Sequence, residues 1–224
     1  MTKRKLTTTA PRTRSHAPKS LLIVECDSEK LARDGLSLAR EVFEEARLLI
    51  PTAKCDLVQA TTESQLLAEF GRRATKNARY DVVLLAGHSN ADSLALARNA
   101  IRPWSVVARW LCPFHPRRVL LAACQAGRRV PSAALFNGID SLQEVYGTPV
   151  LATQAQLALL KVLVYCLLAG VKVQREPLRF AQIANFALTG GLVFRQTRAD
   201  LRSHGRAEAA AWTTLEDVLT ALTR

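Results

Sequence analysis

Two short polar segments follow apolar runs directly and carry residue types suited to nucleophilic catalysis. The run Leu84-Leu85-Ala86 is followed by Gly87 and His88, and the run Leu120-Leu121-Ala122-Ala123 is followed by Cys124. A thiol is a weak nucleophile at its ordinary pKa of about 8.5, and a nearby imidazole can deprotonate it or hold it as a thiolate–imidazolium pair. We therefore predict that His88 and Cys124 form a catalytic pair for acyl-transfer chemistry.

This chemistry requires the two segments to lie side by side, and the surrounding pattern provides for that. Short apolar runs alternate with stretches whose apolar residues recur at helical spacing. The alternation predicts an α/β fold, a three-layer sandwich in which helices cover both faces of a mostly parallel sheet of about six strands. Ligands bind such sheets at the carboxyl ends of the strands. The predicted strands span 20–26, 55–60, 80–87, 118–123, 148–153 and 192–197, and the predicted helices span 29–50, 62–77, 132–146, 157–169, 177–188 and 215–222.

The amino-terminal residues differ in composition from the rest of the chain. Residues 1–19 contain six lysines or arginines and no acidic residue, and no apolar stretch of a secretory signal follows them. A chain of 224 residues suffices for one well-buried domain and is short for two. We expect a flexible basic tail over residues 1–19 and a single domain over residues 20–224.

Charge and cysteine content limit the partners and the compartment. The net charge of +12 allows attraction to nucleic acid or acidic proteins, but no nucleic-acid-binding motif accompanies the basic clusters, so nucleic acid is not expected as the primary ligand. The longest apolar segment, 157–171, is interrupted by Lys161 and is short for a membrane span. Five cysteines without paired spacing favour a reducing cytoplasm.

The two motifs together resemble the caspase-like cysteine peptidases, which include caspases, metacaspases, separase, legumain and the bacterial CHAT domains. The segment His88–Leu96 resembles the CHAT stretch that follows its histidine, and Val119–Gly127 resembles the second motif of that family. The resemblance covers roughly residues 78–155. It implies a caspase-like fold, an endopeptidase that cleaves proteins at restricted sites, and chemistry that needs no metal or cofactor.

The resemblance also implies roles for individual residues. Cys124 would attack the peptide carbonyl, and His88 would act as base and then protonate the leaving amine. The backbone N–H groups of Ser89 and Cys124 would form the oxyanion hole. The family usually has glycine at the position of Ser89, and the caspase signature Gln-Ala-Cys-x-Gly is absent because Ala122 replaces its glutamine. We therefore expect a caspase-like relative rather than a caspase.

Substrate preference follows from the resemblance as well. Several relatives carry acidic groups at strand ends that favour a basic residue before the scissile bond. Asp27, which follows the predicted strand 20–26, is the candidate here, with Gln125 beside the nucleophile; Asp27 could instead cap the next helix. The expected partners are a protein or peptide substrate and an activating or regulatory protein. Bacterial relatives often act in defence or programmed cell death.

Two other interpretations remain open. A caspase-like fold without turnover would leave His88 and Cys124 as structural residues and act as a basic scaffold that binds protein or nucleic acid. Cys112 and His115 have a spacing found in zinc proteins, but no second ligand pair accompanies them, so we expect no metal site.

Overall fold

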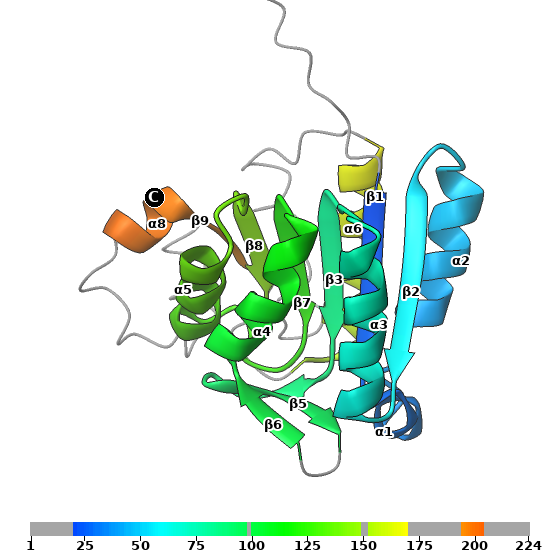
Figure 1. The fold of residues 1–224 in the computed structure, drawn as a ribbon, viewed down its shortest axis with the longest axis horizontal. Coiled ribbons are helices and arrows are strands. Elements are labelled where there is room, and N and C mark those ends of the chain that lie inside the picture. Colours follow the sequence, from blue (N-terminus) through cyan, green and yellow to red (C-terminus); the bar gives the residue numbers. More distant parts are fainter. Residues whose placement is uncertain (1–19, 98–99, 149–151, 170–193, 204–224) are drawn as a thin grey trace, which may run out of the picture.

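The computed structural model describes residues 20–97, 100–148, 152–169 and 194–203. The predicted tail at 1–19 and the predicted helices at 177–188 and 215–222 lie outside these ranges. Within them, a six-stranded sheet is covered by helices on both faces (Figure 1). The predicted three-layer α/β sandwich with a mostly parallel sheet is confirmed.

The central sheet has the strand order β2-β1-β3-β7-β8-β9. Neighbouring strands are parallel except for β8 and β9, which are antiparallel. The carboxyl ends of β1, β3 and β7 are therefore adjacent along one edge of the sheet. The strands are β1 (Ser20–Cys26), β2 (Lys54–Ala60), β3 (Val82–Ala86), β7 (Arg118–Ala122), β8 (Glu144–Gly147) and β9 (Phe194–Thr197).

Alternate side chains of the strands build two hydrophobic cores, because successive residues of a strand point to opposite faces. Leu22 and Val24 pack in the core under α3, α4 and α5, whereas Leu21 and Ile23 pack in the core under α2 and α6. Figure 1 shows α3 and α4 in front of the sheet and α6 behind it. None of the helices in the described ranges has the length and apolar character needed to cross a membrane. These helices are α2 (Ala39–Leu49), α3 (Glu63–Thr75), α4 (Trp104–Leu111), α5 (Arg129–Gly138) and α6 (Gln154–Leu168).

A small antiparallel sheet follows β3 and was not predicted. It consists of β4 (His88–Ser89), β5 (Ser93–Ala97) and β6 (Ala100–Pro103). Strands of two to five residues are too short for their periodicity to be recognised in a sequence. The helix α4, the short 3₁₀ turn η1 (Cys112–Phe114) and the helix α8 (Arg198–Ser203) were also not predicted.

The single helix predicted over residues 29–50 is wrong. The chain forms α1 (Ser28–Arg33) and α2, which are separated by a turn in which Gly35 has the left-handed φ of 68°. The turn terminates α1 through hydrogen bonds from Gly35 N to Ala32 O (3.2 Å) and from Leu36 N to Leu31 O (2.8 Å). Glycine adopts this backbone conformation without steric cost, so the helix ends here.

The predicted helix at 132–146 is also corrected, and half of the strand predicted at 148–153 falls outside the described ranges. The helix α5 ends at Gly138, and the next strand is β8 at Glu144–Gly147, whereas residues 149–151 lie outside the described ranges. Pairing of Glu144–Gly147 with β7 on one side and β9 on the other fixes this segment as a strand. Neither interaction is local in sequence, so the pattern along the chain does not reveal it.

A carboxylate on β8 joins three strands. Arg118 on β7 donates to Glu144 Oε2 through Nε at 2.7 Å, and Arg195 on β9 donates to Glu144 Oε1 through Nε at 3.0 Å. Tyr146 also donates its hydroxyl to Glu144 Oε2, at 3.1 Å. Burial acts to raise the pKa of Glu144, but the hydrogen bonds from Arg195 and Arg118 outweigh it and hold this pKa below its ordinary value.

Replacing Glu144 with glutamine is expected to lower the free energy of unfolding at pH 7 by about 1–3 kcal/mol, because two partly buried guanidinium groups lose their counter-charge. A carboxylate whose pKa is lowered by folding stabilises the protein above its unfolded pKa of about 4.3 and loses that effect as the pH falls through the folded pKa. The difference in Tm between wild type and E144Q should therefore be largest at pH 7 and shrink below pH of about 4.

The matched control is Glu41→Gln, because Glu41 pairs with Lys161 at 2.6 Å, 56% of the Glu41 side chain is exposed, and Lys161 keeps Glu45 as a second partner. An exposed pair of this kind contributes about 0–1 kcal/mol. Thermal unfolding of both variants at several pH values makes the comparison. Equal losses in E41Q and E144Q, or a loss in E144Q that does not depend on pH, would contradict the assignment.

Candidate active site

The strand register brings the two predicted catalytic residues to neighbouring strand ends. Ala86, the last residue of β3, is paired with Ala122, the last residue of β7. Gly87 N continues the ladder by donating to Ala122 O at 3.3 Å. His88 and Cys124 each follow this paired position by two residues. Figure 1 shows the β5–β6 hairpin and α1 beside the same edge of the sheet.

The His88 ring approaches the carboxyl end of α1. The backbone of His88 belongs to β4, opposite Ala95 of β5, and 22% of its side chain is exposed. Its Nε2 atom is buried and lies 3.1 Å from Asp34 Oδ2, without the alignment of a hydrogen bond. Burial lowers the pKa of His88 and nearby Lys30 lowers it further, whereas Asp34 and Asp27 act to raise it. The net decrease favours a neutral imidazole at neutral pH, which is the form that accepts a proton.

Cys124 occupies the turn that leads from β7 to α5 and is partly exposed. Ala152, two residues before the start of α6, donates its backbone N–H to the Cys124 sulfur at 3.3 Å. A negatively charged sulfur accepts such a hydrogen bond more strongly than a neutral thiol does. The contact therefore suits a nucleophile that passes through a thiolate.

Hydrogen bonds join the loop that contains His88 to the loop that contains Cys124. The Ser89 hydroxyl donates to the backbone carbonyl of Cys124. Asn90 N donates to Ser93 O at 3.0 Å, so Asn90 and Ser93 are a hydrogen-bonded pair. Hydrogen-bonded and non-hydrogen-bonded pairs alternate along an antiparallel ladder. The pair Ser89–Leu94 is then of the non-bonded kind, so Ser89 N–H points away from β5, to the side on which Gly87 N–H meets β7. A glycine in place of Ser89 would have the N–H but not the hydroxyl contact.

The turn after Cys124 approaches the end of β8 closely. Gly127 N donates to Thr148 O at 2.7 Å. A Cβ atom added to Gly127 would lie 2.5 Å from the carbonyl carbon of Gly147, and one added to Gly147 would lie 2.8 Å from Gly127 N. Gln125 has the left-handed φ of 56° within the same turn. The glycine of the second motif therefore permits close backbone packing behind the nucleophile.

Asp27, predicted as a substrate-binding residue, lies at the same edge of the sheet. It follows β1 directly, is 7% exposed and has the left-handed φ of 53°. Its backbone carbonyl accepts from Lys30 N and Leu31 N at 3.0 Å each, so Asp27 is the N-cap residue of α1, yet its side chain makes no capping hydrogen bond. The carboxylate is therefore not used to cap α1.

Glu25, the other acid at the end of β1, has a structural role. It is fully buried and accepts hydrogen bonds from Ser37 Oγ (2.9 Å), Ala39 N (3.4 Å) and Gln59 Nε2 (2.8 Å). Its carboxylate therefore holds the start of α2 against β1 and β2. In the described part of the chain, no group of three or more His, Cys, Asp or Glu residues could hold a metal ion, the Cys112–His115 segment included.

Asp34 was missed in the sequence because the predicted helix 29–50 ran through it. Its carboxylate instead lies against His88, at the carboxyl end of α1. The dipeptide Asp34-Gly35 is a turn signal that could have indicated the break. The contact between Asp34 and His88 depends on the tertiary fold and is not visible in the local sequence.

Relationships to known proteins provide no further assignment for this site. A scan against protein-family models finds no match, and a search of curated proteins finds no significant match.

Proposed function

We propose that this chain is a cysteine endopeptidase in which His88 and Cys124 form the catalytic pair. The observation that carries the proposal is the in-register pairing of β3 with β7, which puts a partly buried histidine and a partly exposed cysteine on adjacent strand ends. The lowered pKa of His88 favours the neutral imidazole, which is the form that can accept the thiol proton. The resemblance of both motifs to caspase-like peptidases supports peptide-bond cleavage as the reaction.

The proposed reaction has two stages. The Cys124 sulfur gives its proton to His88 and attacks the carbonyl carbon of the peptide, which forms a C–S bond and a tetrahedral oxyanion. His88 then protonates the amine, the C–N bond breaks, and a thioester remains on Cys124. In the second stage, His88 takes a proton from water, the resulting hydroxyl adds to the thioester carbonyl, and the C–S bond breaks as the thiol regains a proton.

Backbone N–H groups stabilise the oxyanion in this proposal. Ser89 N–H points toward the side of β7, as inferred from the ladder alternation, and Cys124 N–H begins the turn that holds the sulfur. The hydroxyl bond from Ser89 to the Cys124 carbonyl keeps the two segments together. Donors fixed before the reaction stabilise developing charge without reorganisation. Serine at this position is therefore compatible with an oxyanion hole.

The proposed substrate is a protein or peptide with a basic residue before the scissile bond. Asp27 supports this preference, because its mostly buried carboxylate makes no capping bond and lies at the same sheet edge as the dyad. Gln125, in the turn after the nucleophile, is the second residue proposed to contact substrate. A regulatory protein partner and a role in the cytoplasm, in bacterial defence or programmed cell death, belong to the same proposal by resemblance alone.

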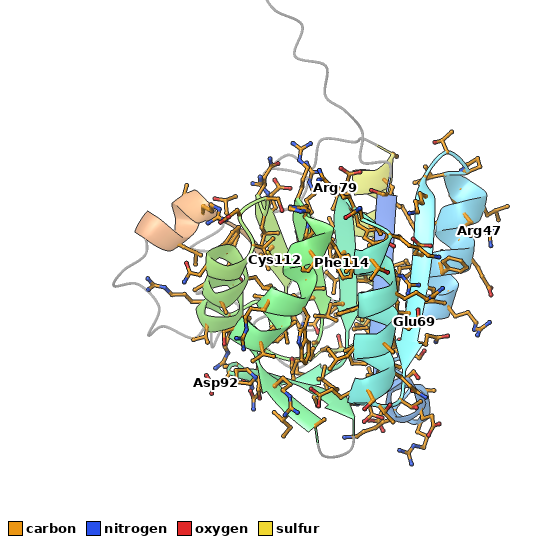
Figure 2. The ribbon with its side chains drawn as sticks, viewed as in Figure 1. Arg47, Glu69, Arg79, Asp92, Cys112 and Phe114 are labelled. Atoms are coloured by element: carbon orange, nitrogen blue, oxygen red, sulfur yellow. The ribbon has the colours of Figure 1, made fainter. Side chains whose placement is uncertain are left out.

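The alternative of a basic scaffold has weaker support. Arg72 pairs with Glu69, and Arg118 pairs with Glu144, so part of the positive charge is neutralised within the protein. Figure 2 shows Arg79 near the amino end of β3. His88 and Cys124 follow the carboxyl ends of β3 and β7, at the opposite edge of the sheet. A partner bound near Arg79 would not explain the arrangement of the dyad.

The test is cleavage of a peptide library derived from a whole proteome, read by mass spectrometry of new amino termini. Wild type is expected to produce termini that follow a narrow set of residues, enriched in Arg and Lys. Cys124→Ala is expected to produce none, because no other group replaces the sulfur. The control Cys55→Ser changes a partly exposed cysteine on β2 and should cleave like wild type. Absence of cleavage by wild type, or cleavage by C124A, would refute the proposal and favour the scaffold.

A further inference from the structure

The turn between α1 and α2 brings a carboxylate against the imidazole of the proposed dyad. Asp34 Oδ2 lies 3.1 Å from His88 Nε2, and that nitrogen is buried. The Asp34 side chain is itself 41% exposed, so the carboxylate lies between solvent and the histidine. Among the described residues, Nε2 has no aligned hydrogen-bond partner, and Asp34 is the acidic group that the structure brings to it.

The position of Asp34 is fixed by the end of α1. Asp34 N donates to Lys30 O at 2.9 Å, and Leu36 N donates across the turn to Leu31 O at 2.8 Å. Leu31 is buried in the core between the sheet and α2. Gly35, with its φ of 68°, reverses the chain directly after Asp34. The turn that presents this carboxylate is therefore anchored to the core through the helix.

We infer that Asp34 is a positioning residue for His88: its carboxylate accepts the Nε2 proton and leaves Nδ1 to exchange protons with Cys124. The partner of one ring nitrogen determines which nitrogen carries the proton in the neutral imidazole. The same carboxylate stabilises the imidazolium that forms when the thiol is deprotonated. This inference rests on the proposed function for its catalytic part, and on the geometry alone for the pairing.

The charges around His88 predict the direction in which each substitution should shift the His88 pKa. Burial and Lys30 lower the pKa of His88, and Asp34 and Asp27 oppose that decrease. These three charged residues belong to α1 and its two ends, and the loop after β7 carries Cys124 and Arg128. Without Asp34 the imidazolium would be less stable, and His88 would be a weaker base toward the thiol.

The experiment titrates His88 by NMR of its imidazole in Asp34→Asn and Lys30→Gln variants, and measures peptide cleavage by the same variants against pH. In D34N the His88 pKa is expected to fall, Nε2 to lose its preference for the proton, and cleavage to slow about tenfold. In K30Q the pKa is expected to rise instead, because a repelling positive charge is removed. The acidic limb of the pH–rate profile should move with the His88 pKa in each case.

The control is Glu29→Gln, an exposed acid on α1 that should change neither the titration nor the rate. An unchanged His88 pKa and tautomer in D34N would overturn the inference. If D34N and K30Q shift the titration in opposite directions while wild type cleaves no peptide, the pairing is supported and the peptidase assignment fails. If cleavage falls in D34N without any change in titration, Asp34 acts on substrate instead and the positioning role is refuted.

Discussion

Replacing His88 with alanine is expected to slow peptide cleavage by about 10²–10⁴-fold, the range that a positioned general base provides. In H88A the sulfur of Cys124 loses its proton acceptor, and the leaving amine loses its proton donor. The fold should be retained, because His88 is partly exposed and its backbone pairing with Ala95 does not depend on the side chain. Cleavage of the fastest library peptide, measured in wild type and H88A, gives the ratio.

The alkylation rate of Cys124 tests the action of His88 on the thiol without requiring a substrate. A thiol with an ordinary pKa of about 8.5 is only about 3% ionised at pH 7, so a neighbouring base increases the reactive fraction substantially. Iodoacetamide labelling between pH 5 and 9, read by mass spectrometry, should be roughly tenfold slower at Cys124 in H88A near pH 7. Cys26 provides an internal reference, because burial raises the pKa of its thiol to about 12.

His115 provides the matched control for this substitution. It is exposed at the end of η1 and has the left-handed φ of 50°, so asparagine, which tolerates that conformation, is the suitable replacement. H115N should leave both cleavage and the Cys124 alkylation rate unchanged. A Cys124 that reacts equally in wild type, H88A and H115N would show that the histidine does not act on the sulfur, and the catalytic assignment would be wrong.

The adjacency of His88 and Cys124 was predictable because each follows a continuous apolar run. Strands buried on both faces give this signal, and parallel strands bring their carboxyl ends to one edge. The turn at Asp34 was not predictable in the same way. Leu31 before it and Leu38 and Val42 after it all pack in one core. Their helical spacing therefore continues across the break, and periodicity predicts one helix where the backbone makes two.

The strand β8, most of which was predicted as the end of a helix, was missed for a different reason. Its sequence, Glu-Val-Tyr-Gly, includes a carboxylate and a hydroxyl that are unfavourable in a buried strand unless they are paired. The partners of Glu144 are Arg118 on β7 and Arg195 on β9, which lie far away in the sequence. Tertiary ion pairing, which no local pattern contains, makes a carboxylate acceptable in the strand that the pairing with β7 and β9 defines.

Replacing Gly127 with alanine is expected to destabilise the protein and disturb the nucleophile together. The added Cβ would lie 2.5 Å from the carbonyl carbon of Gly147 and 2.8 Å from that of Thr148, and backbone atoms cannot move aside as a flexible side chain can. Overpacking of this kind costs about 1–3 kcal/mol, which corresponds to a Tm lower by roughly 2–12 °C for a chain of this size. Thermal unfolding measures this loss directly.

The functional part of this prediction follows from hydrogen bonds at the same glycine. Gly127 N donates to Thr148 O, and Gln196 Nε2 donates to Gly127 O at 2.6 Å, so the turn is fixed to β8 and β9. Displacing the turn moves the backbone that carries Cys124, and the alkylation rate of Cys124 in G127A should fall as well. A loss of stability without any change at Cys124 would mean that the turn yields locally and the nucleophile is positioned from β7 alone.

Gly71→Ala makes the same chemical change where the structure leaves room. Gly71 lies within α3, and a Cβ added there would meet no atom within 4 Å. Alanine at a helical position of this kind is expected to raise stability by about 0.5–1 kcal/mol, because it restricts the unfolded chain and favours the helix. Opposite signs for G71A and G127A would tie the cost at Gly127 to its close approach to Gly147. A stabilising G127A would instead show that the motif's glycine is not required by packing, and its place after Cys124 would need another cause.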